Sequence, residues 1–331
     1  MRTNKFIYSL SVLALTFGLI ISACKKKDPK PEEPAIVTED GQTSMDNRWA
    51  QTENDLAISD INTEVSNSAA LHGKSSSGAN VNALHAALNM AITDYTVDTT
   101  GAYTGTIKIN YNGTVVNNRK RTGSIKLSIP NYPAKKWKDA GCVLKVEYIN
   151  YKIMRVSDAK TMKVNGTQNI TNESGGSWWE LIVLTSQPNL VTTVTGSFLY
   201  VAFDSTKTAV YNINRRFTYT MPNNILTCQC EGIGTYNGLT QLENYGANRD
   251  GIVFTSQVIA PVIWKLNCGA HAPVQGEMSI KANDRNFTLK VLYSVDANGK
   301  LVNVLSNTCP YGWKVEWINN SVPGKRVFAY N

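Results

Sequence analysis

From Tyr95 onward the chain alternates apolar and polar residues in short runs, which is typical of antiparallel strands with one buried and one wet face. Turn-forming residues bound the runs, and Asn112-Gly113 and Asn165-Gly166 are read as turns. The runs are TGTIKINYNGT, RKRTGSIKLSI, CVLKVEYINYKI, TMKVNGTQNI, VTTVTGSFLYVAF, TAVYNINRRFTYT, GIVFTSQVIAPVIWKL, GEMSIKA, NFTLKVLYSV, KLVNVL and WKVEWI. About a dozen strands are too many for one flat sheet. The pattern therefore predicts a mainly β body over 96–331, either an antiparallel two-layer sandwich or a long curled sheet, with room for two sub-domains that meet near residue 222.

Residues 43–95 differ in composition, being rich in Ala, Asn, Asp and Ser, and we expect a helical segment there. Two apolar stripes run along it, with Met45, Trp49 and Leu56 on one face and Ala57, Ile61 and Val65 on the next. The flexible stretch 73–78 separates a second helix-like piece over 81–92. Stripes of this kind usually pack on a sheet, so we expect the N-terminal helical segment to pack on the β body.

The N-terminus has the features of an export signal. Arg2 and Lys5 precede an apolar run over 6–21, and Ile21-Ser22-Ala23-Cys24 closes it. This tetrapeptide matches the lipobox of bacterial lipoproteins, whose cysteine receives acyl chains such as palmitate. We predict a lipoprotein signal peptide over 1–23, then an acylated Cys24 and a flexible tether over 24–42. The residue directly after the cysteine is Lys25 and not Asp, which by analogy with other lipoproteins of diderm bacteria favours lipid anchoring in the outer membrane. The protein could face either the periplasm or the cell exterior.

Several motifs are similar to those of a known group of proteins. They are RKRTGSIKLSI, DAGCVLKVEYINYKI and KVNGTQNITN in the first half, and Asn248-Arg249-Asp250-Gly251, Leu266-Asn267-Cys268, a strand beginning at Gly276, and Cys309 in the second. The chain thereby resembles β-rich outer-membrane lipoproteins of the Bacteroidota over most of its mature length. The resemblance implies a β-rich envelope lipoprotein, and the group supplies no established activity.

Five cysteines remain when the lipidated one is set aside, so at least one has no disulfide partner within the chain. Disulfides persist in exported proteins. Cys268 and Cys309 are placed on C-terminal strands that hairpins can bring within bridging range, and we predict a disulfide between them. Cys142 has Cys228 or Cys230 as its candidate partner.

A zinc site is the alternative use of the same residues. Cys228, Cys230, Cys268 and His271 supply three sulfurs and an imidazole, which is a tetrahedral zinc set. Disulfides and a surface histidine are the favoured explanation, because the spacing is not that of a zinc knuckle and export favours disulfides. We therefore expect no cofactor, with zinc as the alternative.

Net charge and residue types limit the function classes. The formal net charge is +8, and removal of Arg2 and Lys5 with the signal peptide lowers it from +8 to +6. The lysines are scattered and no nucleic-acid motif accompanies them, so we expect no nucleic-acid partner. With 3 histidines and no Gly-x-Ser-x-Gly elbow, a serine-hydrolase triad is not supported. A glycosidase needs two carboxylates, and the acids considered are Asp139, Glu147, Glu180, Glu243, Asp250 and Glu277.

Aromatic residues provide the positive indication of binding. Trp178 and Trp179 are adjacent, and on a strand they would face opposite sides, so that one is core and the other exposed. Tyr236 and Tyr245 are further candidates for ligand contact. We expect a non-catalytic lipoprotein that is anchored in the outer membrane and acts as a binding or structural module, with the membrane and a glycan or envelope protein as partners. A glycan-binding module is the first alternative, a polysaccharide-active hydrolase the second, and a lipid carrier with a large apolar cavity the third.

Overall fold

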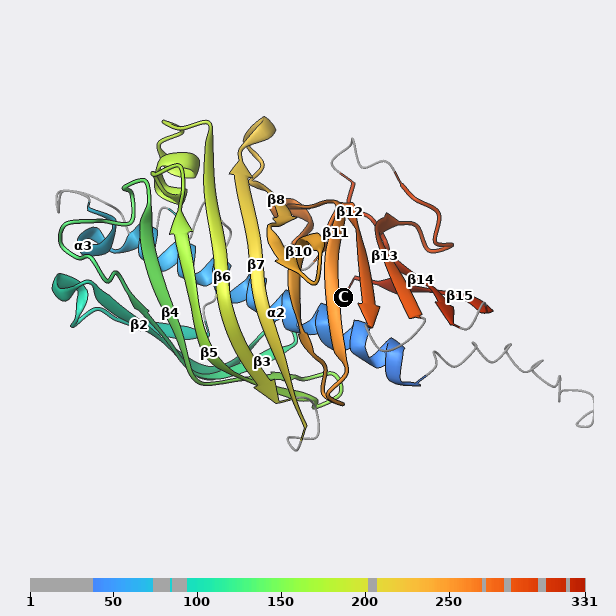
Figure 1. Ribbon diagram of the computed structural model, residues 1–331. Helices are drawn as coiled ribbons and strands as arrows, with labels where there is room; N and C mark the ends of the chain where they lie inside the picture. The colour runs from blue at the N-terminus through green and yellow to red at the C-terminus, as the bar shows by residue number, and fades with distance from the viewer. Residues whose placement is uncertain are drawn as a thin grey trace, which may run out of the picture. The chain divides into compact units, whose positions relative to one another are not determined.

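The computed structural model describes residues 38–73, 84, 94–201, 207–269, 272–282, 287–302, 308–319 and 322–330 (Figure 1). The predictions for the signal peptide, Cys24, the tether up to residue 37 and His271 lie outside these residues, as does the piece over 81–92 except for Leu84. From Thr38 onward the chain is one compact unit.

One antiparallel sheet of 15 strands contains the strands of the described chain. The mainly β fold is therefore confirmed, and of the two predicted architectures the long curled sheet is the one present. The strands are β1 (Tyr95–Asp98), β2 (Thr106–Val116), β3 (Arg119–Ser128), β4 (Cys142–Arg155), β5 (Thr161–Asn172), β6 (Asn189–Val201), β7 (Thr208–Thr220), β8 (Thr227–Gly232), β9 (Gly234–Tyr236), β10 (Leu239–Ala247), β11 (Val253–Lys265), β12 (Gln275–Ala282), β13 (Phe287–Val295), β14 (Gly312–Asn319) and β15 (Val322–Ala329).

Strands that follow one another in sequence are mostly neighbours in the sheet. The exception is the centre, where β7 pairs with β10 along its first half and with β8 along its second half. Strand β8 also pairs with β11, and β9 pairs with β10 alone. The sheet thus continues across residue 222, because β8, which follows this residue, pairs with β7, which precedes it.

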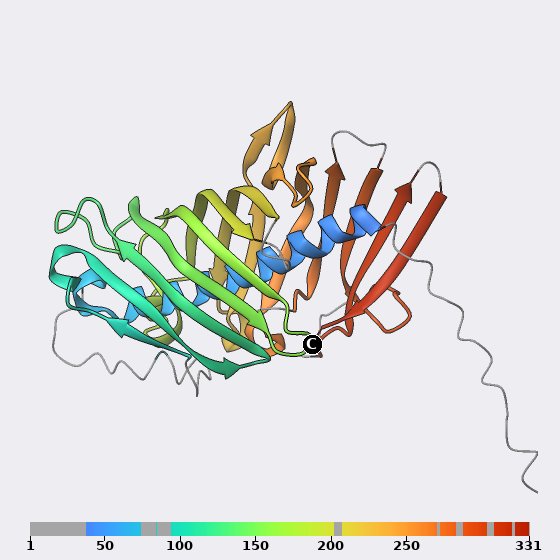
Figure 2. The same ribbon diagram turned by 90° about the horizontal axis from the view of Figure 1, so that it is seen from below.

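A long helix, α2 (Thr38–Asn67), lies along the concave side of the sheet and crosses its strands, as Figure 2 shows. We call this concave side the trough. The short helix α3 (Ala69–His72) follows, with the side chain of Ser68 accepting a hydrogen bond from the Leu71 N–H at its start. Gly73 ends it with a φ of 84°, a conformation that glycine adopts without strain.

The apolar stripes of α2 are buried only in part as predicted. Ala57, Ile61 and Val65 have no exposed surface, so this stripe is core. Met45, by contrast, is 40% exposed and Leu56 is half-buried, because these side chains lie on the open side of the trough. Of the other predicted stripe, Trp49 is the member that is buried, at 7% exposed, so the apolar contact of the helix is made by Trp49 together with Ala57, Ile61 and Val65.

Four acidic side chains of α2 lie beside these apolar residues, largely buried, and each of the four meets an arginine of the sheet. The pairs are Asp46 with Arg249 at 2.5 Å, Glu53 with Arg119 at 2.7 Å, Asp55 with Arg215 at 2.5 Å, and Asp60 with Arg121 at 2.8 Å. A buried carboxylate that loses its partner costs several kcal/mol. These arginines consequently fix the register of the helix in the trough.

Neutral polar groups complete the helix–sheet interface. The Asn54 amide donates hydrogen bonds to the Tyr148 hydroxyl at 3.0 Å and to Gln168 Oε1 at 3.1 Å. Farther along the helix, the Tyr95 hydroxyl donates to Glu64 at 2.8 Å. The interface between α2 and the sheet therefore combines apolar packing with many specific polar contacts.

Two pairs that were predicted as turns lie within strands. Asn112-Gly113 is inside β2 next to an irregularity in its pairing with β3, and Asn165-Gly166 is inside β5. The turn after β2 uses Asn117 and Asn118, both with positive φ. Asparagine tolerates this conformation better than most residues, which is why the turn forms without glycine.

Replacing Arg215 should lower the stability of the protein far more than replacing its neighbour Arg216. The Arg215 side chain is 1% exposed and pairs with Asp55, whereas that of Arg216 is 44% exposed and pairs with Glu173 on the outer face. Arg215→Met leaves buried acids unpaired and should lower the free energy of unfolding by about 3 to 5 kcal/mol. Arg216→Met should lower it by less than about 1 kcal/mol. Urea unfolding measures both, and equal losses would contradict the proposed role of the interior pair.

Candidate functional site

An aromatic pocket of about 70 Å³ opens between α2 and the central strands. Its lining is mostly apolar and comes from segments far apart in sequence. The lining residues are Asp55, Ile58, Ser59, Trp178, Phe217, Tyr219, Leu226, Cys228, Trp264, Lys265 and Leu266.

The floor of the aromatic pocket is a row of three side chains on neighbouring strands. Tyr219 of β7 lies opposite Cys228 of β8, and Cys228 lies opposite Trp264 of β11. Directly opposed residues in an antiparallel sheet share one face, so the small thiol sits between two large rings. Trp178 adds a wall, since its ring meets that of Tyr219 edge-on at 5.5 Å between centroids.

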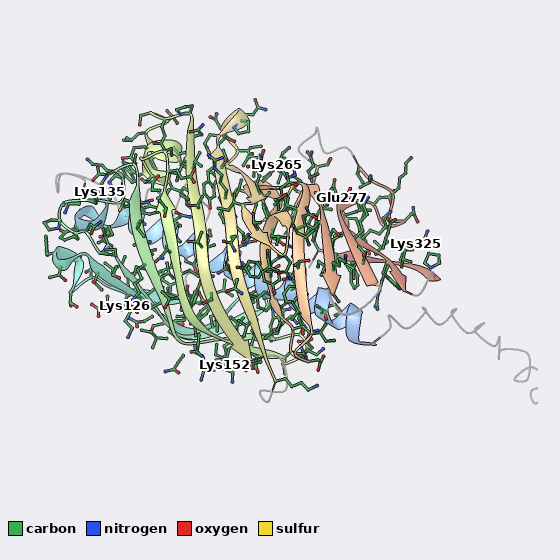
Figure 3. The ribbon with its side chains drawn as sticks, in the orientation of Figure 1. Lys126, Lys135, Lys152, Lys265, Glu277 and Lys325 are labelled. Carbon is green, nitrogen blue, oxygen red and sulfur yellow. A yellow bond between two sulfur atoms is a disulfide. The ribbon has the colours of Figure 1, made fainter. Side chains whose placement is uncertain are left out.

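Charged groups lie along one side of the pocket. The Asp55 carboxylate is part of the lining and accepts hydrogen bonds from Arg215 at 2.5 and 3.2 Å. A second carboxylate, Glu243, is 3.8 Å from Arg215, and burial raises its pKa despite the nearby guanidinium. Lys265, at the end of β11 in Figure 3, is also part of the lining, although it follows Trp264 and its side chain starts toward the other face of the sheet.

The Cys228 thiol is held in its neutral form. Burial is the main cause that raises its pKa well above the ordinary value, and the nearby Cys230 and Asp55 raise it further. Burial likewise raises the pKa of Tyr219. The pocket environment therefore disfavours added negative charge.

Trp178 and Trp179 do not lie on a strand, which was the basis of their prediction. They belong to a short helical turn, with a π-helix over Trp179–Val183. Trp178 is 4% exposed and Trp179 is half-buried, so the expected difference in burial exists for another geometric reason. The helical turn directs Trp178 into the pocket.

Tyr236 and Tyr245 form a separate aromatic pair. Their rings stack at 4.5 Å between centroids with an interplanar angle of 12°. Tyr245 lies opposite Asn212 of β7, whose neighbours Tyr211 and Ile213 are buried against the trough, so Tyr245 faces outward. The four aromatic candidates consequently divide between two faces of the sheet.

The cysteines form one disulfide, between Cys268 and Cys309, which confirms the predicted pair. Cys142, Cys228 and Cys230 are free, so the suggested partner for Cys142 was wrong. Arg215 donates a hydrogen bond to Cys230 Sγ at 3.3 Å. Because Cys268 is bonded to Cys309, it cannot supply a thiolate to the predicted zinc set. Within the described ranges no cluster of three or more His, Cys, Asp or Glu is placed to hold a metal ion.

His72, Ser177 and Glu180 form a cluster that the sequence analysis did not bring together. His72 Nε2 lies 2.9 Å from both Ser177 Oγ and Glu180 Oε2, and Ser177 donates to the same carboxylate oxygen at 2.5 Å. Ser177 is fully buried and also accepts a hydrogen bond from the Trp179 N–H at 3.0 Å. A serine nucleophile needs access to substrate and a histidine that an acid orients through its other nitrogen. In this cluster one Glu180 oxygen contacts both His72 and Ser177, so the three side chains tie α3 to the start of the helical turn.

The acids considered for glycosidase chemistry have partners within the chain. Asp139 accepts from the Lys136 N–H, Glu147 pairs with Lys145, Glu180 with His72, Glu243 with Ser256, Asp250 with Lys207, and Glu277 with Lys290. The acid with the most clearly raised pKa is Asp60, at about 6, mainly because of burial. Asp60 lies inside the trough on Arg121, so no described pair of carboxylates stands in an open cleft.

A lipid carrier requires a large enclosed apolar cavity, whereas the two larger hollows of the described residues, of about 470 and 440 Å³, are open at the surface and have polar residues such as Glu64 and Asn224 in their lining. The aromatic pocket has about half the volume of a cavity that admits benzene, roughly 150 Å³. In the part of the chain that the structure describes, no helix has the length and hydropathy needed to cross a membrane. Comparison with family models, curated proteins and solved structures gives no match to this chain.

Glu180→Gln should weaken the fold near neutral pH and have little effect in acid. Although burial raises the pKa of Glu180, hydrogen bonds from His72 and Ser177 lower it to about 2, from an ordinary value of 4.5. The stabilisation is therefore complete above pH 4.5 and is lost as the pH falls toward 2. The free energy of unfolding should drop by up to about 3 kcal/mol at about pH 7 and by much less at about pH 3.

Glu147→Gln is the matched control for this measurement. The hydrogen bond from Lys145 lowers the pKa of Glu147 as well, but this pair lies on the outer surface. Solvent screening leaves such pairs a small contribution. Urea unfolding at the two pH values should show a pH-dependent loss for Glu180→Gln alone, and a loss for Glu180→Gln that is the same at both would refute the assignment.

Proposed function

We propose that this chain is a lipid-anchored, non-catalytic binding module of the outer membrane, and that the aromatic pocket is its binding site. The single observation that carries the binding role is the row of Tyr219, Cys228 and Trp264, with Trp178 as a wall, which places large rings around an open apolar space. Ligand sites commonly combine an apolar lining with a few convergent polar groups.

The partners of the acidic groups support a non-catalytic role. Catalytic acids and bases need access to substrate and a pKa suited to proton transfer. In the described chain the acids with raised pKa values, Asp60 and Glu243, are buried against Arg121 and Arg215. The His72 cluster is equally enclosed, since Ser177 is fully buried. These groups are positioned to hold the helix and the sheet together.

The anchoring part of the proposal is supported by the sequence of the leader. The charged start, the apolar run and Ile21-Ser22-Ala23-Cys24 fit acylation of Cys24, and the chain that follows is a polar tether. The tether precedes α2, so the anchor is joined to the helix and not to the sheet. Resemblance to outer-membrane lipoproteins of the Bacteroidota gives the same location.

A glycan-binding surface is a second candidate function, favoured by one observation on the outer face. Thr167, Ser197, Asn212 and Tyr245 lie directly opposite one another across β5, β6, β7 and β10. Hydroxyl and amide groups beside the stacked tyrosine pair are the chemistry by which sugars are bound, through hydrogen bonds and ring contact.

Acylation of Cys24 should be detectable by labelling with an alkyne analogue of palmitate in a diderm bacterium. Wild-type chain should incorporate the label and fractionate with the outer membrane, because the acyl chains provide its anchor. Cys24→Ser should lose both properties, whereas Cys228→Ser should retain them. Equal labelling of wild type and Cys24→Ser would show that the anchor prediction is wrong.

A glycan array distinguishes the outer-face candidate. If the stacked pair binds sugar, Tyr245→Ala should weaken binding about fivefold, because an aromatic contact contributes roughly 1 kcal/mol. Tyr311→Ala removes a tyrosine that is 50% exposed elsewhere on the surface and should leave binding unchanged. Trp178→Ala should also leave it unchanged, since Trp178 faces the trough. Absence of binding to every glycan would eliminate this second candidate.

A further inference from the structure

We infer that the aromatic pocket recognises a methylated ammonium group, as in choline. The inference rests on the proposed binding function of the pocket and specifies its ligand class. Quaternary ammonium groups are bound by several aromatic rings that surround the cation, often with a carboxylate nearby. Trp178, Tyr219 and Trp264 with Asp55 make such a set.

The spacing of the floor suits a cation between two rings. Tyr219 and Trp264 are on the same face of strands that flank β8, so their backbones are two inter-strand spacings, or about 10 Å, apart. A cation above Cys228 would lie one inter-strand spacing, roughly 5 Å, from each of these strands and between two side chains on the same face. A ring attracts a cation within about 6 Å of its centre. Cys228, which stands between them, is small enough to leave that space open.

The size of the pocket favours a compact group. Its volume of about 70 Å³ is less than half that of a cavity of roughly 150 Å³ that binds benzene, so a whole sugar ring or acyl chain would not fit inside it. A trimethylammonium group is similar in size to benzene, so we expect its methyl groups to enter through the open side against the rings, with the rest of the molecule left in solvent.

The charge of the site favours a cation over a neutral group of the same shape. Asp55 lines the pocket, and its side chain is 11% exposed, whereas its partner Arg215 is 1% exposed and lies behind it. A ligand therefore meets the carboxylate before the guanidinium. Glu243 places a second carboxylate on the same arginine, so two acids share one base. The Arg215 guanidinium lies 4.7 Å from the centre of the Phe217 ring, so a cation–π contact already exists beside the pocket.

The test is calorimetric titration of the full-length chain carrying Cys24→Ala with choline and with its neutral isostere, in which a tert-butyl group replaces the trimethylammonium group. Choline should bind at least about tenfold more tightly than the isostere, because only the cation gains from the rings and Asp55. Equal binding of the two would overturn the assignment of a cation while leaving a binding pocket. No binding of either would overturn the binding function of the pocket as well.

Two variants locate the site. Trp264→Leu keeps the apolar character but removes a ring, and Cys228→Leu fills the floor between the rings; each should weaken choline binding at least about tenfold. The control is Trp313→Leu, the same substitution at a tryptophan that stacks on Phe328 and does not line the pocket. This variant should not affect binding. If Trp264→Leu does not fold, Cys228→Leu and the isostere comparison decide the question. Unchanged binding in folded Cys228→Leu would place choline elsewhere and overturn the inference.

A vesicle experiment separates a lipid headgroup from a soluble ligand. The same chain is sedimented with vesicles of phosphatidylcholine and of phosphatidylglycerol. Retention by the first alone would assign the methylated ammonium to a lipid headgroup, whereas choline binding without retention would assign it to a soluble molecule. Retention by phosphatidylglycerol alone, with no choline binding, would contradict the inference.

Discussion

The contact between Asp55 and Arg215 is the interaction on which the rest of the fold depends. It joins the middle of α2 to the strand where the sheet changes partners, since β7 pairs with β10 before Arg215 and with β8 from Arg215 onward. Two buried ions of opposite charge gain little over a well-packed apolar pair, but an unmatched one is costly. The ion pair therefore selects one placement of the helix more than it adds stability. The other arginine–acid pairs repeat this selection on both sides of it.

How far the sequence could predict this fold depends on the range of the interactions that form each element. The run TAVYNINRRFTYT coincides with β7, because a long alternation has one buried face and needs no knowledge of its neighbours. The segment over β8, β9 and β10 was missed, since Gly232, Gly234 and the Asn237-Gly238 turn interrupt the alternation. Its pairing is set by β7 and β11, which no local pattern contains.

The same limit applies to the candidate site. The predicted disulfide was correct because both cysteines are near one end of the chain and flank few strands. The aromatic pocket was not predicted as a unit, since it requires the register that sets Tyr219 opposite Cys228 and Cys228 opposite Trp264. Polar burial of α2 was missed for a similar reason, because its acids find arginines more than sixty residues away.

The position of α2 also determines how the fold would respond to mechanical force. The chain enters the compact unit at Thr38, so tension applied from the N-terminal side is transmitted first to the helix. The earliest contacts under tension are Thr43 with Asn248 and Asp46 with Arg249, while the Asp55 pair lies about three turns farther along. Tension would thus detach α2 from the sheet starting at its N-terminal end, and its polar contacts would break one after another. Each broken contact can re-form while the next one holds, so the helix would yield to load in steps and not all at once.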